Sequence, residues 1–271
     1  MQEASALTVN QFQLVLNTLN LTVAVFGGFA LLFALAGSTV APAYRLGVAV
    51  MTAVFAVAGY HYLRIYGNWQ SAFAFEGGAY LPSSLPVNHV LRYADWIGTV
   101  PLILAATVLV LDLGRGKTVS LVGRLAAAAV LMIGLGYVGE LERGDLVLRG
   151  VWGAAGMVPF LYIVWVLYGE MSSVLEFESA RVRGLFRDLR LLTLLSWSFY
   201  PVAYALPILG LGGSNANIIV QVGNSLADLT AKVGVGLLVL ALARAKSQEA
   251  AALAVPEAQG APRSLAGVAH D

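Results

Sequence analysis

Seven long apolar segments dominate the sequence and limit what the chain can fold into. Each is close to the ~20 residues that an α-helix needs to cross the hydrocarbon core of a bilayer. Transmembrane β-strands would be about 9–11 residues long with alternating polarity, so segment length favours helices. The sequence therefore predicts an all-α membrane protein, a seven-transmembrane-helix bundle. The segments cover approximately residues 14–36, 44–66, 88–111, 118–138, 149–169, 190–210 and 217–243.

The supply of charge agrees with a membrane protein. Charged residues make up 11% of the chain and hydrophobic residues 59%, whereas a soluble domain carries roughly 25% charged residues. This composition argues against a soluble enzyme, a nucleic-acid-binding protein and a disordered protein. The chain contains no cysteine, which excludes disulfides and thiolate sites.

The distribution of Lys and Arg predicts the orientation. Loops that face the cytoplasm carry an excess of these residues. If the N-terminus lies outside, three such residues fall on the outer side (Arg64, Arg143 and Arg149) and eleven on the cytoplasmic side. We therefore expect a seven-helix transmembrane domain at 1–246 with the N-terminus outside. A disordered cytoplasmic tail rich in Ala, Pro, Glu and Gly is expected to follow at 247–271. The eleven are Arg45, Arg115, Lys117, Arg124, Arg181, Arg183, Arg187, Arg190, Arg244, Lys246 and Arg263.

Away from the ends of the apolar segments lie four charged residues, namely Arg92, Asp95, Asp228 and Lys232. Charges at membrane depth are costly, so they face the bundle interior and mark functional sites. Asp228 and Lys232 are four residues apart and share a helical face. One interpretation is a salt-bridge cluster that only joins two helices. The other uses Lys232 as a desolvated amine, the kind that forms Schiff bases.

Three sequence motifs around these charges resemble the microbial rhodopsins. Residues 92–102 (RYADWIGTVPL) resemble the third helix of that family, 197–201 (WSFYP) the sixth, and 228–234 (DLTAKVG) the seventh. The motifs occur in the family's order on seven helices and cover essentially the whole chain. Residues 59–64 and 77–80 look like the proteorhodopsin and xanthorhodopsin branch.

The resemblance implies a role for each of these residues. Lys232 would carry all-trans-retinal as a protonated Schiff base, and Asp95 and Asp228 would be its counterions, with Asp95 the primary proton acceptor. Thr99 would hydrogen-bond near Asp95, and Arg92 would steer the released proton outward. The retinal pocket would be lined by Tyr93, Trp96, Ile103, Met132, Gly136, Gly156, Phe160, Trp197, Tyr200, Pro201 and Tyr204.

His61 is expected at the depth of Asp95. Each lies about seven residues inside the outer end of its helix, or ~10 Å at 1.5 Å per residue. The proteorhodopsin branch shows a His–Asp pair, which would keep the carboxylate responsive near neutral pH. The alternative is a buried histidine bonded to backbone or water.

The sequence also bears on two further ligands, a carotenoid and a metal ion. Xanthorhodopsin-like proteins with glycine at the position of Gly156 have a side window that can seat a carotenoid antenna; the alternative for Gly156 is helix packing. No ligand spacing supports a metal site, although His89 lies among outer carboxylates.

Ala106 departs from the family pattern. It lies eleven residues after Asp95, about 16 Å toward the cytoplasm on the same helical face. Outward pumps of this family usually hold Asp or Glu there as the proton donor. The donor position is therefore lost, and the source of reprotonation is open.

The resemblance implies a light-driven outward proton pump that is favoured at acidic pH, a transporter and not an enzyme. The alternative is a retinal photosensor with a slow photocycle. An anion pump is disfavoured because Asp95 puts negative charge where chloride would sit, and an inward pump because Asp228 is present. We expect the protein to lie in the bacterial cytoplasmic membrane, in contact with lipid, and to bind no nucleic acid. We also expect it to form a homo-oligomer, either a trimer or a pentamer.

Overall fold

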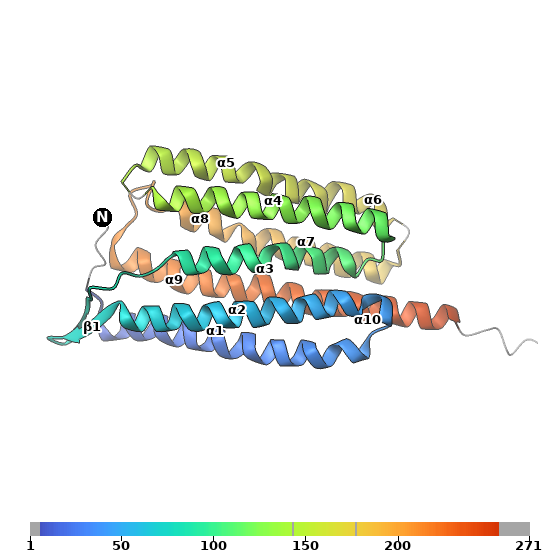
Figure 1. Ribbon diagram of the computed structural model, residues 1–271, viewed down its shortest axis with the longest axis horizontal. Helices are drawn as coiled ribbons and strands as arrows, with labels where there is room; N and C mark the ends of the chain where they lie inside the picture. Colours follow the sequence, from blue (N-terminus) through green and yellow to red (C-terminus); the bar gives the residue numbers. More distant parts are fainter. Residues whose placement is uncertain (1–5, 143, 177, 255–271) are drawn as a thin grey trace, which may run out of the picture.

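The computed structural model describes residues 6–142, 144–176 and 178–254. Arg143 and Arg263 of the charge argument lie outside these residues. The described chain forms a bundle of long helices that run side by side (Figure 1). The first four crossings are single helices: α1 (Val9–Ala36), α2 (Arg45–Ser71), α3 (Val90–Leu109) and α4 (Arg115–Leu141).

The last three crossings are interrupted helices. The fifth runs through α5 (Leu146–Trp165), the π-helical turn η3 (Val166–Glu170) and α6 (Met171–Leu175). The sixth consists of α7 (Ala180–Trp197) and α8 (Phe199–Ala205). The seventh consists of α9 (Gly213–Leu229), the π-helical turn η4 (Thr230–Gly234) and α10 (Val235–Ala254). The seven predicted crossings are thus confirmed by helix count.

Local sequence sets several helix starts. The Thr8 side chain accepts a hydrogen bond from the Gln11 amide, and the Gln11 side chain accepts one from the Thr8 amide, a capping box that begins α1. Asp145 and Ser179 begin α5 and α7 with simpler caps, in which one side-chain oxygen accepts from the backbone amide three residues later.

Between α2 and α3 the chain forms a β-hairpin that the apolar pattern did not predict. Strand β1 (Phe73–Glu76) pairs antiparallel with β2 (Ala79–Pro82) across Gly77 and Gly78, both at positive φ. Tyr80 pairs with Leu7 through backbone hydrogen bonds and stacks on Phe12. The hairpin therefore holds the start of α1, and we call this end of the bundle the hairpin end. The opposite end, where α10 leaves the bundle, is the α10 end (Figure 1).

The helices close into a ring. Each of α1 to α4 packs against its successor, α5 contacts α8, α7 packs against α10, and α9 packs against α1. Large apolar side chains also cover the outside, such as Leu35 at 75% and Val147 at 79% exposure. Five crossings are long and apolar enough to span a membrane by composition alone. The other two, α3 and α7–α8, carry charged residues, and the chain as a whole is a multi-pass membrane protein.

One boundary differs from the expectation. The disordered tail was expected from residue 247, but α10 continues to Ala254. Ser247 explains part of the difference, because its side chain accepts a hydrogen bond from the Ala41 amide and donates one to the Ala243 carbonyl. The rest of the expected tail, 255–271, lies outside the described residues.

Candidate functional site

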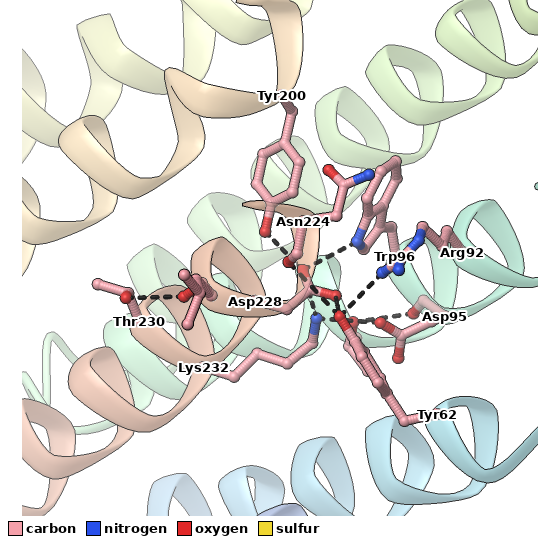
Figure 2. A network of polar contacts seen from close by, with 11 residues as sticks. Tyr62, Arg92, Asp95, Trp96, Tyr200, Asn224, Asp228, Thr230 and Lys232 are labelled. Atoms are coloured by element: carbon pink, nitrogen blue, oxygen red, sulfur yellow. Dashed lines mark hydrogen bonds and ion pairs between the residues drawn. The ribbon is translucent and has the colours of Figure 1, made fainter. Parts of the chain in front are cut away.

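The centre of the bundle holds a lysine between two carboxylates. Lys232 lies in η4, and its side chain is 2% exposed. Its Nζ is 3.0 Å from Asp95 Oδ2 and 3.1 Å from Asp228 Oδ1 (Figure 2). A buried charge is tolerated only when it is paired, and here one cation meets two anions.

The two carboxylates are held very differently. Asp228 accepts hydrogen bonds from the Tyr62 hydroxyl at 2.7 Å, from Trp96 Nε1 at 3.0 Å and from the Tyr200 hydroxyl. Apart from its ion pair with Lys232, Asp95 has no hydrogen-bond partner at either Oδ atom among the described residues, although it is fully buried. Asp228 is thus fixed by neutral donors, whereas Asp95 keeps its lone pairs free.

Arg92 provides the second buried cation. Its Nη1 donates to the Tyr62 hydroxyl at 3.0 Å, and its Nη2 donates to Gln221 Oε1 at 2.8 Å. Arg92 lies in the first turn of α3, three residues before Asp95, so it is on the hairpin side of the lysine. The sequence placed Arg92 there but identified neither Tyr62 nor Gln221 as its partner. The one feature of the sequence that pointed to Tyr62 was its place next to His61 in the motif at residues 59–64.

A cavity of about 1590 Å³ reaches the amine of Lys232. It extends toward the hairpin end, where residues of the hairpin and of the loop after α8 line it. Aromatic rings make much of the inner wall, which suits an apolar conjugated ligand. All eleven residues expected in the retinal pocket line this cavity: Tyr93, Trp96, Ile103, Met132, Gly136, Gly156, Phe160, Trp197, Tyr200, Pro201 and Tyr204.

His61 and Thr99 lie near Asp95 without bonding to its carboxylate. Thr99 Oγ1 donates to the backbone carbonyl of Asp95 at 2.8 Å. The buried Nδ1 of His61 has no hydrogen-bond partner among the described residues. Its ring meets Tyr60 edge to face instead. The expected His61–Asp95 pair therefore consists of neighbours without a direct hydrogen bond.

The geometry at Gly156 supports the packing interpretation. A Cβ built there would lie 3.3 Å from the Met132 carbonyl oxygen and 3.6 Å from the Gly136 nitrogen. Both contacts are backbone atoms of α4, so the missing side chain lets α5 approach α4 closely.

Ala106 is completely buried in α3, on the α10 side of the lysine. Asp95 and Asp228 are the two carboxylates among the residues described as buried. The interior on the α10 side therefore offers no described carboxylate that could replace the missing one. The described residues also contain no group of three or more His, Asp or Glu side chains that could hold a metal ion.

A seven-helix membrane bundle with a cavity-lining lysine between two buried carboxylates defines the class of retinal proteins. The comparisons with known proteins agree. The family model described as "Bacteriorhodopsin-like protein" matches residues 11–246. The chain belongs to this family of microbial rhodopsins.

Individual relatives show the range of the family. Bacteriorhodopsin of Halobacterium salinarum is 38% identical over 149 residues, which are 55% of either chain, so the match spans about half of that relative. The blue-light absorbing proteorhodopsin of a gamma-proteobacterium is 28% identical over 212 residues, covering 76% of this chain and 77% of the relative. Sensory rhodopsin III of Haloarcula marismortui is 35% identical over 167 residues, covering 60% of this chain and 67% of the relative.

A solved structure extends the likeness to the whole bundle. Xanthorhodopsin, titled a light-driven ion pump with a dual chromophore, superposes with a TM-score of 0.88 at 39% identity. The alignment covers 92% of this chain and 99% of that one. The homologues are pumps or photosensors and not enzymes.

Proposed function

We propose that this protein is a light-driven outward proton pump with retinal bound at Lys232. The observation that carries the proposal is the difference in hydrogen bonding between the two carboxylates beside the buried amine of Lys232. Asp228 is surrounded by three neutral donors, which stabilise its charged form. Asp95 has only its ion pair with Lys232 and is free to accept a proton.

The residues present fit retinal. The family binds retinal, and Lys232 presents its Nζ to an aromatic-walled cavity. Retinal held there as a protonated Schiff base would supply the absorption of light and a change of shape that redirects the proton of the nitrogen. The chain's residues do the rest.

Asp95 receives the proton because it lies 3.0 Å from Nζ, close enough for direct transfer. Arg92 is joined to the other carboxylate, Asp228, through the Tyr62 hydroxyl, which accepts from Arg92 Nη1 and donates to Asp228 Oδ2. Arg92 and Gln221 lie on the hairpin side, so they favour the hairpin end as the exit. With the N-terminus outside, as the excess of Lys and Arg at the α10 end supports, this exit is extracellular.

The decisive experiment is the light-induced pH change outside cells or vesicles supplied with retinal. An outward pump acidifies the medium, and a protonophore abolishes the signal. No change, or a change of opposite sign in right-side-out vesicles, would contradict the proposal.

A photosensor is the second candidate. The relative sensory rhodopsin III and the loss of a carboxylate at Ala106 favour it. A sensor would complete its photocycle in the same vesicles without a steady pH change. The pH measurement therefore separates the two functions.

We further propose a bacterial cytoplasmic membrane location and a trimer or pentamer, on the strength of the resemblance. The mass of the detergent-solubilised protein tests the second point. A carotenoid antenna is not part of the proposal, because the Cβ direction of Gly156 faces the α4 backbone.

A further inference from the structure

The half of the bundle between Lys232 and the α10 end offers few polar groups to a proton. Its interior is apolar, with Leu104, Val108, Val235 and Val239 at most 2% exposed. The buried hydroxyl of Thr107 donates to the carbonyl of its own helix four residues earlier. A proton that crosses this half must therefore be carried by water that enters when the helices separate.

A sheltered ion pair joins the helices at the α10 end. Lys246 of α10 pairs with Glu178, which precedes α7, and the two side chains are 10% and 19% exposed. The same ammonium donates to the Leu111 carbonyl at 2.9 Å and lies 5.9 Å from the centre of the Tyr44 ring. One side chain thus connects the last helix to the loops between α1 and α2, α3 and α4, and α6 and α7.

The surrounding contacts are weaker or more exposed. Ser179 donates to Glu249, and Arg181 donates to Gln248, both at the surface. The charged groups around this point also include Asp112 and Glu249 near the Tyr44 hydroxyl, and Arg183, whose Nη1 donates to the Glu178 carbonyl at 2.6 Å. Exposed pairs contribute little because water competes with them, whereas breaking a buried pair leaves an uncompensated charge. The Lys246–Glu178 pair is therefore the most sheltered of these side-chain contacts between the start of α7 and α10.

Glu178 is too far from Lys232 to hand over a proton directly. Fourteen residues separate Lys232 from Lys246 along the seventh crossing, or about 21 Å at 1.5 Å per residue. The pair can influence proton entry only through the opening of the helices.

We propose that the Lys246–Glu178 pair is a lock that sets how often water and protons enter the α10-end half of the bundle. This inference rests on the proposed pumping function, because it concerns the return of the proton to Lys232. Both residues act as positioning residues. If the lock opens transiently and a proton then enters from bulk water, the return rate is the product of the open fraction and the proton concentration.

The kinetic test is the recovery of the dark-state absorption after a flash, measured across pH. Lys246→Met and Glu178→Gln should both speed recovery, by about three- to tenfold at every pH, with an unchanged slope against pH. Lys246→Arg keeps the charge and should restore the parent rate. Arg181→Gln, which alters an exposed contact beside the lock, is the matched control and should recover like the parent.

The two partners must act in the same direction. If Glu178→Gln slowed recovery while Lys246→Met hastened it, Glu178 would be a proton relay and the lock would be wrong. Unchanged rates in both variants would also overturn it.

A second measurement does not depend on pumping. In the protein without retinal, amide hydrogen exchange reports the opening of backbone hydrogen bonds. Glu178→Gln should quicken exchange in residues 104–111 and 235–246 but not in the α2 segment 54–65. Equal exchange in parent and variant would refute the lock, whereas a failure to pump with quickened exchange would refute only the proposed function.

Discussion

The Nζ of Lys232 lies 3.0 Å from Asp95 Oδ2, and no hydrogen-bond donor among the described residues competes for that carboxylate. The other carboxylate, Asp228, is almost as close to Nζ but accepts three hydrogen bonds from neutral side chains. The two aspartates are equally buried and almost equally close to Nζ, but they differ in how readily they can accept a proton. The site's chemistry depends on this difference.

Replacing Lys232 tests where the chromophore is attached. Lys232→Ala should give folded protein that shows no visible absorption after retinal is added, because the cavity then has no amine. Lys246→Ala is the matched control, since it removes the other buried lysine, which does not line the cavity. Absorption spectra settle the point, and a coloured Lys232→Ala protein stable to hydroxylamine would exclude the assignment.

Replacing the two aspartates separately tests their unequal roles. Asp95→Asn removes negative charge beside the nitrogen, so absorption should shift to the red and outward transport should stop. Asp228→Asn instead disturbs a carboxylate bonded to Tyr62, Trp96 and Tyr200, so thermal stability should fall more than in Asp95→Asn. Spectra, vesicle pH changes and thermal bleaching of the two variants measure this. Normal pumping by Asp95→Asn would place the acceptor elsewhere.

The Tyr62 hydroxyl bridges Arg92 and Asp228, so its removal should be felt by both. Tyr62→Phe leaves a buried donor and acceptor without their partner, which costs about 1–3 kcal/mol. Tyr60→Phe is the control, because Tyr60 is 55% exposed and its hydroxyl accepts from an exposed arginine. Thermal bleaching should begin at lower temperature in Tyr62→Phe alone. Equal stability of the two variants would mean that the bridge contributes nothing.

The sequence allowed the depth of the buried charges to be predicted, because apolar run lengths and 1.5 Å per residue fix positions along a helix. Lys232, Asp95 and Arg92 lie in the predicted order along the bundle axis. The length of an apolar segment does not determine how the helix is rotated about its own axis, and so does not show which neighbours a side chain faces. This is why Tyr62 and Gln221 were missed as partners of Arg92, and why His61 was expected to bond to Asp95.

Backbone irregularities were equally hidden. The π-helical turn η4 surrounds Lys232, and such turns are frequent at functional sites. A π-helical turn has more residues than an α-helical turn, and the apolar pattern of the seventh crossing does not reveal it. The hairpin of β1 and β2 was also missed, because four-residue strands carry too short a pattern to distinguish from loop.

Gly156 tests close packing of α4 and α5. In Gly156→Trp the new side chain would be directed at the α4 backbone, so the yield and thermal stability of the pigment should fall. Gly134→Trp is the control, because a Cβ at Gly134 meets nothing within 4 Å. If Gly156→Trp were as stable as the parent and blocked energy transfer from an added carotenoid, the site would be an antenna window after all.

We predict that the return of the proton to Lys232 depends on bulk water at the α10 end, because Ala106 stands where an internal proton donor would lie. An internal carboxylic acid would supply the proton at a rate nearly independent of pH. Without one, the rate should follow proton concentration, so recovery should slow about tenfold for each unit that pH rises, equivalent to 1.4 kcal/mol. The acid limit is reached where Asp95 is already protonated before the flash. Turnover should then be favoured in acid above that limit.

Ala106→Glu should flatten this dependence and speed recovery at alkaline pH, because the new carboxyl lies on the α10 side of the lysine and can store a proton between turnovers. Ala106→Gln is the matched control: it adds nearly the same volume to a fully buried position but cannot release a proton, so it should keep the parent's slope. The measurement is recovery of the dark-state absorption across pH in all three proteins. A parent rate that does not change with pH would mean that another group supplies the proton, and Ala106 would then not limit the cycle.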